Sequence, residues 1–340
     1  MERTRTALVL GATGGIGGEA AAALLRRGWT VRALHRDPAA AARGTPWLDG
    51  VVWMRGDAIR PAEVVEAARG AALIVHAVNP PGYRRWGELV LPMLESSIAA
   101  ARASGARILL PGTVYNYGPD TFPVLTEGSP QNPRTRKGTI RAEMERRLRM
   151  AAETAGVRTL IVRAGDFFGP RAGNSWFSQG LVRPGRPLRS ITYPGRAGVG
   201  HAWAYLPDVA EAMACLVEEA ALGAFESFHF AGHWDADGTT MVSAIRRAVG
   251  DPGLRVRRFP WEMVAAASPF VPLFRELWEL RHLWREPLRL DNARLANALG
   301  AEPHTPIEVA VRDTLAGLGC LGGPAGQAPS GRPSRPVLAA

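Results

Sequence analysis

The sequence predicts an α/β protein built on a doubly wound parallel sheet, with a smaller α/β substrate lobe towards the C-terminal side. An apolar strand near the start of the chain runs into a glycine-rich turn and a helix. Strand-like and helix-like segments then alternate, which is typical of a parallel sheet covered by helices on both faces. The 340 residues, of which 46% are hydrophobic, are enough to bury a large core with an added lobe.

The first part of the chain predicts a β-α-β unit. Its strand spans 7–10, its helix about 16–27 and its second strand 30–34, and the turn after the first strand reads Gly-x-x-Gly-x-x-Gly. In such a Rossmann-type turn, the glycines permit a tight bend, a close approach to a pyrophosphate and close packing of the helix. The helix N-terminus offers N–H groups to the phosphates. The predicted cofactor contacts are Gly11, Thr13, Gly14, Gly15, Ile16 and Gly17.

The end of the second strand indicates which nicotinamide cofactor is bound. An NAD site carries an acid about 20 residues after the first glycines, where it binds the ribose 2′-hydroxyl. That place holds His35 and Arg36, and Asp37 follows one or two residues too late. A guanidinium pairs with a 2′-phosphate. The sequence therefore favours NADP over NAD, with His35 and Arg36 as contacts; a solvated loop charge is the alternative for Arg36.

Strands and helices continue to alternate along the chain. Further strands are predicted at 51–54, 73–78, 107–110 and 158–162, and helices near 61, at 86–104 and at 140–155. The C-terminal third predicts helices at 240–249, 290–299 and 306–318, a strand within 251–258 and helical segments within 261–284.

This order suggests a division into two parts. Residues 1–171 and 197–231 are assigned to the nucleotide-binding domain, and residues 172–196 and 232–319 to the substrate lobe. Residues 320–340 are rich in Gly, Pro, Ser and Ala and are predicted to be a disordered tail.

Composition narrows the class of protein. The formal charge is +10, but the basic residues are scattered arginines with a single lysine, Lys137, and no nucleic-acid-binding signature accompanies them. No apolar run approaches a membrane span, and Cys215 and Cys320 suggest no disulfide framework. His229 and His233 show no recognised metal-ligand spacing. We therefore expect a cytoplasmic protein that binds a small-molecule substrate and no metal, nucleic acid or membrane.

Five motifs in combination carry a family resemblance. The first is the glycine spacing with Thr13, and the others are LLPGTVYNYG at 109–118, RAGDFFGP at 163–170, HAWAYLPD at 201–208 and DNARLANALG at 291–300. Together they resemble the extended short-chain dehydrogenase/reductase superfamily, in its NAD(P)-dependent epimerase/dehydratase family. The resemblance spans about residues 6–318. It implies the same fold and, as the family expectation, a homodimer through helices of the cofactor domain.

The resemblance also implies roles for individual residues. Thr113 would donate a hydrogen bond to the hydroxyl or carbonyl of the substrate. Asp57 would cap the adenine ring, with Ala58 and Ala77 also among the cofactor contacts. The alternative for Asp57 is the N-cap of the helix that begins near residue 61. Asp208 would cap the helix that follows it.

The catalytic motif departs from that family. The family carries Tyr-x-x-x-Lys on a helix, where both side chains share a face. Here the matching positions hold Lys137 and Arg141. Arg141 would hold the ribose hydroxyls, and we hypothesise that Lys137 is the general acid/base or orients the substrate carbonyl, because a desolvated amine beside another cation loses its proton readily. The alternative is a degenerate site with an exposed lysine. Tyr115 is a second candidate proton donor, whereas Tyr117 is expected to pack structurally.

Asp166 is a second departure. It replaces an asparagine that contacts the substrate in sugar-nucleotide epimerases of the family. A carboxylate would repel a diphosphate, which disfavours a nucleotide-sugar substrate. The alternative is a turn acid paired with Arg163 or Arg171.

These features predict an NADP-dependent oxidoreductase of the epimerase/dehydratase group that acts on a carbonyl or alcohol carbon of a small molecule. One alternative is an epimerase or dehydratase that recycles its own NAD(P). The other is a non-catalytic NADP-binding sensor or scaffold that kept the fold and lost the Tyr-Lys pair.

Overall fold

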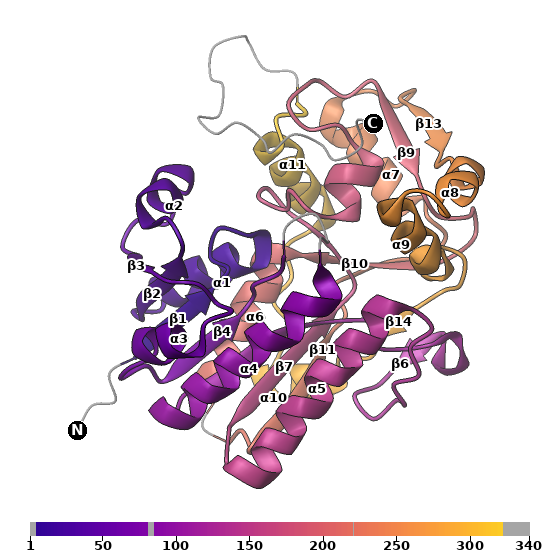
Figure 1. The fold of residues 1–340 in the computed structure, drawn as a ribbon. Helices are drawn as coiled ribbons and strands as arrows, with labels where there is room; N and C mark the ends of the chain where they lie inside the picture. Colours follow the sequence, from indigo (N-terminus) through magenta and orange to yellow (C-terminus); the bar gives the residue numbers. More distant parts are fainter. Residues whose placement is uncertain (1–4, 81–84, 220, 322–340) are drawn as a thin grey trace.

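A seven-stranded sheet forms the centre of the computed structural model, which describes residues 5–80, 85–219 and 221–321 (Figure 1). All neighbouring strands run parallel. Their order is β11 (Phe225–Phe230), β7 (Thr159–Ala164), β5 (Arg107–Thr113), β4 (Leu73–His76), β1 (Thr6–Leu10), β2 (Thr30–His35) and β3 (Val52–Arg55). The chain runs outwards from β1 to β3 and then crosses to β4 and beyond, so the sheet is doubly wound and the predicted fold class is confirmed.

Helices cover both faces of the sheet (Figure 1). One face carries α1 (Gly15–Arg26), α6 (Leu206–Glu218) and α10 (Ala293–Leu299). The other face carries α3 (Pro61–Ala67), α4 (Trp86–Ser104) and α5 (Arg136–Ala155).

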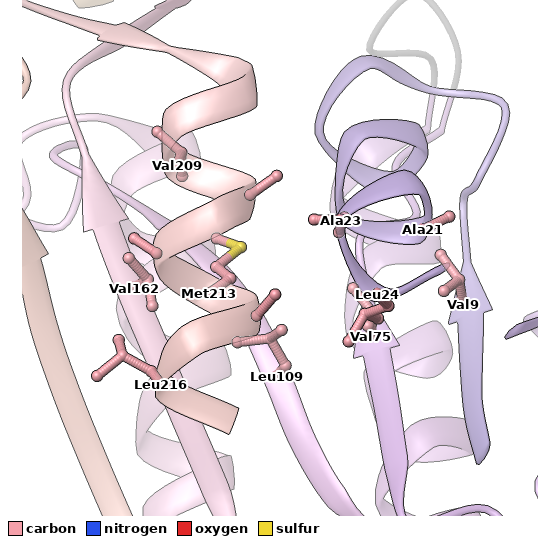
Figure 2. Packing of buried hydrophobic residues seen from close by; sticks show 14 of the residues in the cluster. Val9, Ala21, Ala23, Leu24, Val75, Leu109, Val162, Val209, Met213 and Leu216 are labelled. Carbon is pink, nitrogen blue, oxygen red and sulfur yellow. The ribbon is translucent and has the colours of Figure 1, made fainter. Parts of the chain in front are cut away.

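The central strands are apolar on both sides because both faces are covered. In Figure 2, Val9, Val75 and Leu109 lie on the face of α1 and α6, where they meet Leu24 and Met213. Successive strand residues point to opposite faces, so their sequence neighbours pack against α3, α4 and α5. These neighbours include Leu8, Ile74 and Ile108. Full burial of one such side chain stabilises the fold by about 1.5–3 kcal/mol.

The rest of the chain forms smaller sheets and helices. A three-stranded sheet joins β12 (His233–Asp235), β10 (His201–Tyr205) and β8 (Asp166–Phe168), and two pairs join β13 (Arg255–Arg258) to β9 (Ser190–Tyr193) and β14 (Arg289–Leu290) to β6 (Val124–Leu125). The remaining α-helices are α2 (Pro38–Gly44), α7 (Thr240–Val249), α8 (Trp261–Ala267), α9 (Pro272–Leu280) and α11 (Ile307–Gly317). The short helices are η2 (Pro119–Thr121), η3 (Phe177–Leu181) and η4 (Arg281–Trp284).

Strand register places the functional loops at one edge of the sheet. Leu10, at the end of β1, pairs with Leu34 of β2 and with His76 of β4. Thr113, at the end of β5, pairs with Ala164 of β7. In an open α/β sheet, ligands bind at this carboxyl edge, where the strand order reverses.

Several element boundaries differ from those predicted. Helix α5 begins at Arg136 and not at 140, because the Thr135 hydroxyl accepts a hydrogen bond from Gly138 N and caps it. The predicted helix at 290–299 begins only at Ala293, since its first residue, Leu290, ends β14 and Asn292 is the N-cap. Cys320, assigned to the tail, is buried, whereas the tail residues 322–340 lie outside the described residues. The division into two domains stays a prediction.

Among the residues that the structure describes, no helix combines the length and the apolar character needed to cross a bilayer.

Candidate active site

The glycine turn leaves no room for side chains where a pyrophosphate is expected to bind. Gly11 has a φ of +91°, and a Cβ there would lie 2.6 Å from the carbonyl oxygen of Ala77. A Cβ on Gly17 would lie 2.2 Å from the carbonyl oxygen of Gly11. Gly14, in an extended conformation, is the N-cap of α1, and within the described chain no side chain caps that helix or adds an acid to its first turn. The turn therefore fits a dinucleotide, because the first N–H groups of the helix and its positive dipole end would favour an anion there.

The remaining predicted loop residues lie on the same turn. Thr13 is exposed, and Gly15 and Ile16 are half-buried in the first turn of α1. A Cβ on Gly15 would lie 2.9 Å from Leu206 Cδ1, so this helix start packs tightly on the start of α6. Ala77 follows β4 and donates its backbone N–H to the Leu10 carbonyl (3.0 Å), which places it against the turn.

The end of β2 carries an exposed arginine, and the acid beside it is engaged in a helix cap. Asp37 caps α2 by accepting a hydrogen bond from Ala40 N (3.0 Å), and this bond is the main reason that the pKa of Asp37 is lowered. The His35 ring is held by the backbone of Asp37 (2.7 and 3.0 Å). Arg36 and Asp37 are both exposed. The exposed guanidinium of Arg36 therefore lies at this edge beside a carboxylate that is engaged at the start of α2.

Asp57 organises the turn before α3. Its Oδ1 accepts from Ile59 N (3.2 Å), and its own N–H donates to Glu63 Oε2 (2.7 Å). The N-cap of α3 is Arg60, so the alternative role of Asp57 as that N-cap is wrong. Ala58 is half-buried in the same turn.

Thr113 opens a chain of polar side chains at the end of β5. Its hydroxyl accepts from Tyr115 N (3.2 Å) and donates to Asn116 Oδ1 (3.4 Å). Asn116 donates to Gln131 (3.1 Å), which donates to Glu145 of α5 (2.7 Å). These contacts tie the loop after β5 to α5.

An ion pair lies at the end of that chain. The Glu145 carboxylate receives two hydrogen bonds from Arg163 of β7 (2.9 and 2.6 Å), and the side chains are 7% and 2% exposed. Burial alone would lower the pKa of Arg163, but the Glu145 charge outweighs it and the pKa is raised. Arg163 is therefore a permanently charged, structural residue of the site.

His229, which contacts Arg163, is held in its neutral form mainly by burial. Burial, with a smaller contribution from Arg163, lowers the pKa of His229 to about 3, so the ring is neutral at pH 7. Its Nδ1 donates to the Leu125 carbonyl (3.2 Å), and its Nε2 accepts from Arg163 (3.1 Å) and from the Tyr117 hydroxyl (3.2 Å). Tyr117 is fully buried, as its expected packing role requires. No group of three or more potential metal ligands occurs among the described residues.

Lys137 is buried in the first turn of α5, with its side chain 5% exposed, so the alternative of an exposed lysine is wrong. Its Nζ lies 2.8 Å from Glu276 Oε2 of α9. Burial lowers the pKa of Lys137; Glu276 opposes this effect, and Arg141 adds to it. A Cβ on Gly138 would lie 2.2 Å from the Tyr115 carbonyl oxygen, so the start of α5 touches the loop after β5. The start of α5, which carries Lys137, therefore lies close to the end of β5, which carries Thr113, and to the loop with Tyr115.

Arg141 lies one turn further along α5 and reaches the end of β4. Its guanidinium carbon is 5.3 Å from the centre of the Trp86 ring, and it donates to Asn79 Oδ1 (3.4 Å). Asn79 follows β4, beside the strand that carries the glycine turn. This position suits a residue that holds ribose hydroxyls.

A small cavity lies beside Val114, the residue after Thr113. Asp166 and His201 line it and contact each other, with His201 Nε2 2.9 Å from Asp166 Oδ2. The His201 ring stacks on Trp284 at 3.9 Å. The cavity is lined by Val114, Gly165, Asp166, His201, Ala202, Leu283 and Leu288.

This pairing corrects the alternative reading of Asp166. Arg163 pairs with Glu145, and Arg171 pairs with Glu19 (2.8 Å), so neither arginine is the partner of Asp166. Asp208 is also misassigned, because it lies inside α6 and accepts from the N–H and hydroxyl of Thr305 (both 2.7 Å). Sequence reasoning missed His201 and Glu276; the one signal for His201 was its place in the HAWAYLPD motif.

The fold and this site together define an NAD(P)-binding enzyme of the short-chain dehydrogenase/reductase type. The model of the NAD dependent epimerase/dehydratase family matches residues 7–229, and the chain belongs to that family. The predictions of the family and of an enzyme are confirmed.

Known relatives agree with this assignment. The chain is 29% identical over 323 residues to a 3-diazoavenalumate denitrifying reductase from Streptomyces sp., covering 88% of this chain and 96% of the reductase. MoeE5 in complex with UDP-glucuronic acid and NAD has a TM-score of 0.71 at 17% identity, and the match covers 92% of this chain and 98% of MoeE5. The UDP-glucuronic acid 4-epimerase from Bacillus cereus in complex with NAD has the same TM-score and coverage at 14% identity. The two solved structures show the fold.

Proposed function

We propose that the protein is an NADP-dependent oxidoreductase that acts on a carbonyl or alcohol carbon of a small molecule. The observation that carries this proposal is the end of β2, where Asp37 is engaged as the cap of α2 and Arg36 is exposed. A guanidinium can form two charge-assisted hydrogen bonds with a 2′-phosphate, but it cannot accept one from a 2′-hydroxyl. The NAD-bound structures have a similar fold but too little sequence identity to decide the cofactor of this chain.

Each residue of the site has a separate proposed role in binding or proton transfer. When bound, the nicotinamide cofactor supplies or accepts a hydride. The glycine turn and the N-terminus of α1 would bind the pyrophosphate, and Arg141 would orient the ribose. Thr113 would donate its hydroxyl hydrogen to the substrate oxygen, exchanging its bond to Asn116 for one to the substrate. Lys137 would give a proton from Nζ to that oxygen during reduction and take it back during oxidation.

Calorimetric titration of the purified protein with NADPH and then with NADH tests the cofactor. We expect Arg36→Asp to weaken NADPH binding by roughly 10- to 100-fold, because a charge-assisted contact is worth about 1.5–3 kcal/mol, and not to weaken NADH binding, because an acid at this place can accept a hydrogen bond from the 2′-hydroxyl. The exposed Arg102 on α4 provides the matched control Arg102→Asp, which should change neither affinity. Equal affinity of the unaltered protein for both cofactors would refute the NADP proposal.

A second candidate reaction is the reductive removal of a diazo group. The named activity of the Streptomyces relative suggests it, and the loss of the catalytic tyrosine favours it. Reduction of an aryl diazonium ion by NADPH forms a C–H bond, breaks the C–N bond and releases N₂ and NADP⁺, so the step consumes no proton.

Replacement of Lys137 separates the two candidate reactions. If a carbonyl is reduced, Lys137→Gln should lower kcat by on the order of 100-fold, because a proton donor is lost. If a diazonium ion is reduced, kcat should change little. NADPH oxidation with a panel of carbonyl compounds and a simple arenediazonium salt provides the measurement. Glu143→Gln, on the exposed face of the same helix, is the control and should leave kcat unchanged with either substrate class.

The epimerase or dehydratase alternative has its own signature. Such an enzyme would restore its cofactor within each turnover, so it would keep NAD(P) through purification and show no net NADPH oxidation. Net oxidation of NADPH would support the reductase.

A further inference from the structure

Helix α9 lies against the start of the helix that carries the altered catalytic pair (Figure 1). Glu276 contacts Lys137 Nζ (2.8 Å), and Glu279 Oε2 accepts from the backbone N–H of Arg136 (3.1 Å). The two glutamates are three residues apart and share one face of α9. Carboxylates are favoured at the positive end of a helix, so this acidic face fits the first turn of α5.

Apolar contacts hold α9 in this position. Leu280 is buried in a cluster that includes Val114, Tyr117 and Leu125 around the loop after β5. On its other side, Phe274, Leu277 and Trp278 pack against the aromatic core of the C-terminal part. Helix α9 therefore connects that core with the loop that follows Thr113.

The groups around Lys137 differ in their effects on its charge. Glu276 and Glu279 face it from α9, and Arg141 faces it from α5. A buried ammonium ion without a counter-ion tends to lose its proton, whereas a carboxylate at contact distance retains it. Glu276 is 26% exposed and Lys137 only 5% exposed, but the oxygen that contacts Nζ, Oε2, is itself buried.

We propose that Glu276 is a positioning residue for Lys137, which keeps Nζ protonated and oriented at the place where the family carries its catalytic tyrosine. The C-terminal part of the chain thus completes the proton-transfer site of the nucleotide-binding part. When Nζ has given its proton to a substrate oxygen, the amine is neutral, and it must take up a proton from solvent before the next turnover. This inference rests on the proposed role of Lys137.

The single lysine makes a direct test possible. In a chain with one lysine, the amines are Lys137 Nζ and the terminal α-amino group. Acetic anhydride reacts with the neutral amine, so the rate of Lys137 acetylation against pH, read by mass spectrometry on the full chain, gives the midpoint of its titration. The α-amino group serves as the internal reference, and no substrate is needed.

We expect Glu276→Gln to lower the midpoint for Lys137 by about one pH unit, a tenfold change in its proton affinity. Glu279→Gln, one turn along the same face, should lower it less, because Glu279 bonds the backbone of Arg136 and not Nζ. Glu276→Asp keeps a carboxylate and should bring the midpoint back close to that of the unaltered protein. An unchanged midpoint in Glu276→Gln, or equal shifts in both glutamine variants, would overturn the proposal. Circular dichroism and NADPH titration identify a variant that fails to fold. If Glu276→Gln fails to fold, the midpoint of Lys137 in Glu276→Asp tests the proposal instead.

Activity gives an independent readout. For a carbonyl substrate, Glu276→Gln should move the alkaline limb of the kcat profile to lower pH by the same amount as the acetylation midpoint, with little change in KM. A shifted midpoint without any effect of Lys137→Gln on turnover would refute the role of Lys137 in catalysis while leaving the pairing intact. The two proposals therefore fail in different ways.

Discussion

Replacing Glu145 by glutamine is expected to destabilise the protein by about 3–5 kcal/mol. The change leaves the guanidinium of Arg163, 2% exposed, without its counter-ion inside the sheet. The neutral ring of His229 beside Arg163 cannot supply the missing negative charge. Urea unfolding followed by circular dichroism at pH 7 measures the effect.

Glu143 provides the matched control on the same helix. It pairs with Arg146 and Arg147 at the surface, where an ion pair is worth about 0–1 kcal/mol, so Glu143→Gln should cost little. The double variant Glu145→Leu with Arg163→Met removes both charges and should recover much of the lost stability. Similar losses in Glu145→Gln and Glu143→Gln would contradict the burial argument.

Acidification from pH 6.5 to 5 is expected to destabilise the protein by up to about 4 kcal/mol per pH unit. Burial lowers the pKa of His76 and His229 to about 3 and that of His233 to about 4, from an ordinary value of 6.5. The unfolded chain then binds at least three protons that the folded chain does not bind. The stabilisation is complete above pH 6.5 and is lost as the pH falls towards 3.

The pH window separates the histidines from the carboxylates. The pKa of Glu143 is lowered to about 2 by its arginine partners. Glu143 therefore changes the pH dependence of stability only below its ordinary pKa of 4.5. Urea unfolding at several pH values between 6.5 and 5 therefore measures the contribution of the histidines to the free energy of unfolding. His76→Asn should remove about a third of the slope, because His229 and His233 still contribute. An unchanged slope in His76→Asn would contradict the assignment.

Much of the cofactor half was predictable because its constraints are local. The glycine spacing indicates a turn that only glycine can form, and the structure places α1 within one residue of its predicted bounds. The positions of Arg36 and Thr113 at strand ends also follow from local pattern. The start of α5 was not predicted, because the cap at Thr135 was not recognised. The earlier start of the helix places Lys137 inside it.

By itself, the sequence determined the fold class, the family and the replacement of the Tyr-Lys pair by Lys137 and Arg141. Only the tertiary structure decided which groups they meet. His201 reaches Asp166 because β10 and β8 are neighbours in a sheet, and Glu276 reaches Lys137 because α9 packs on the start of α5. Local periodicity reports which face of an element is buried, but it does not report which distant element covers that face. The charge state of a buried group depends on that second fact.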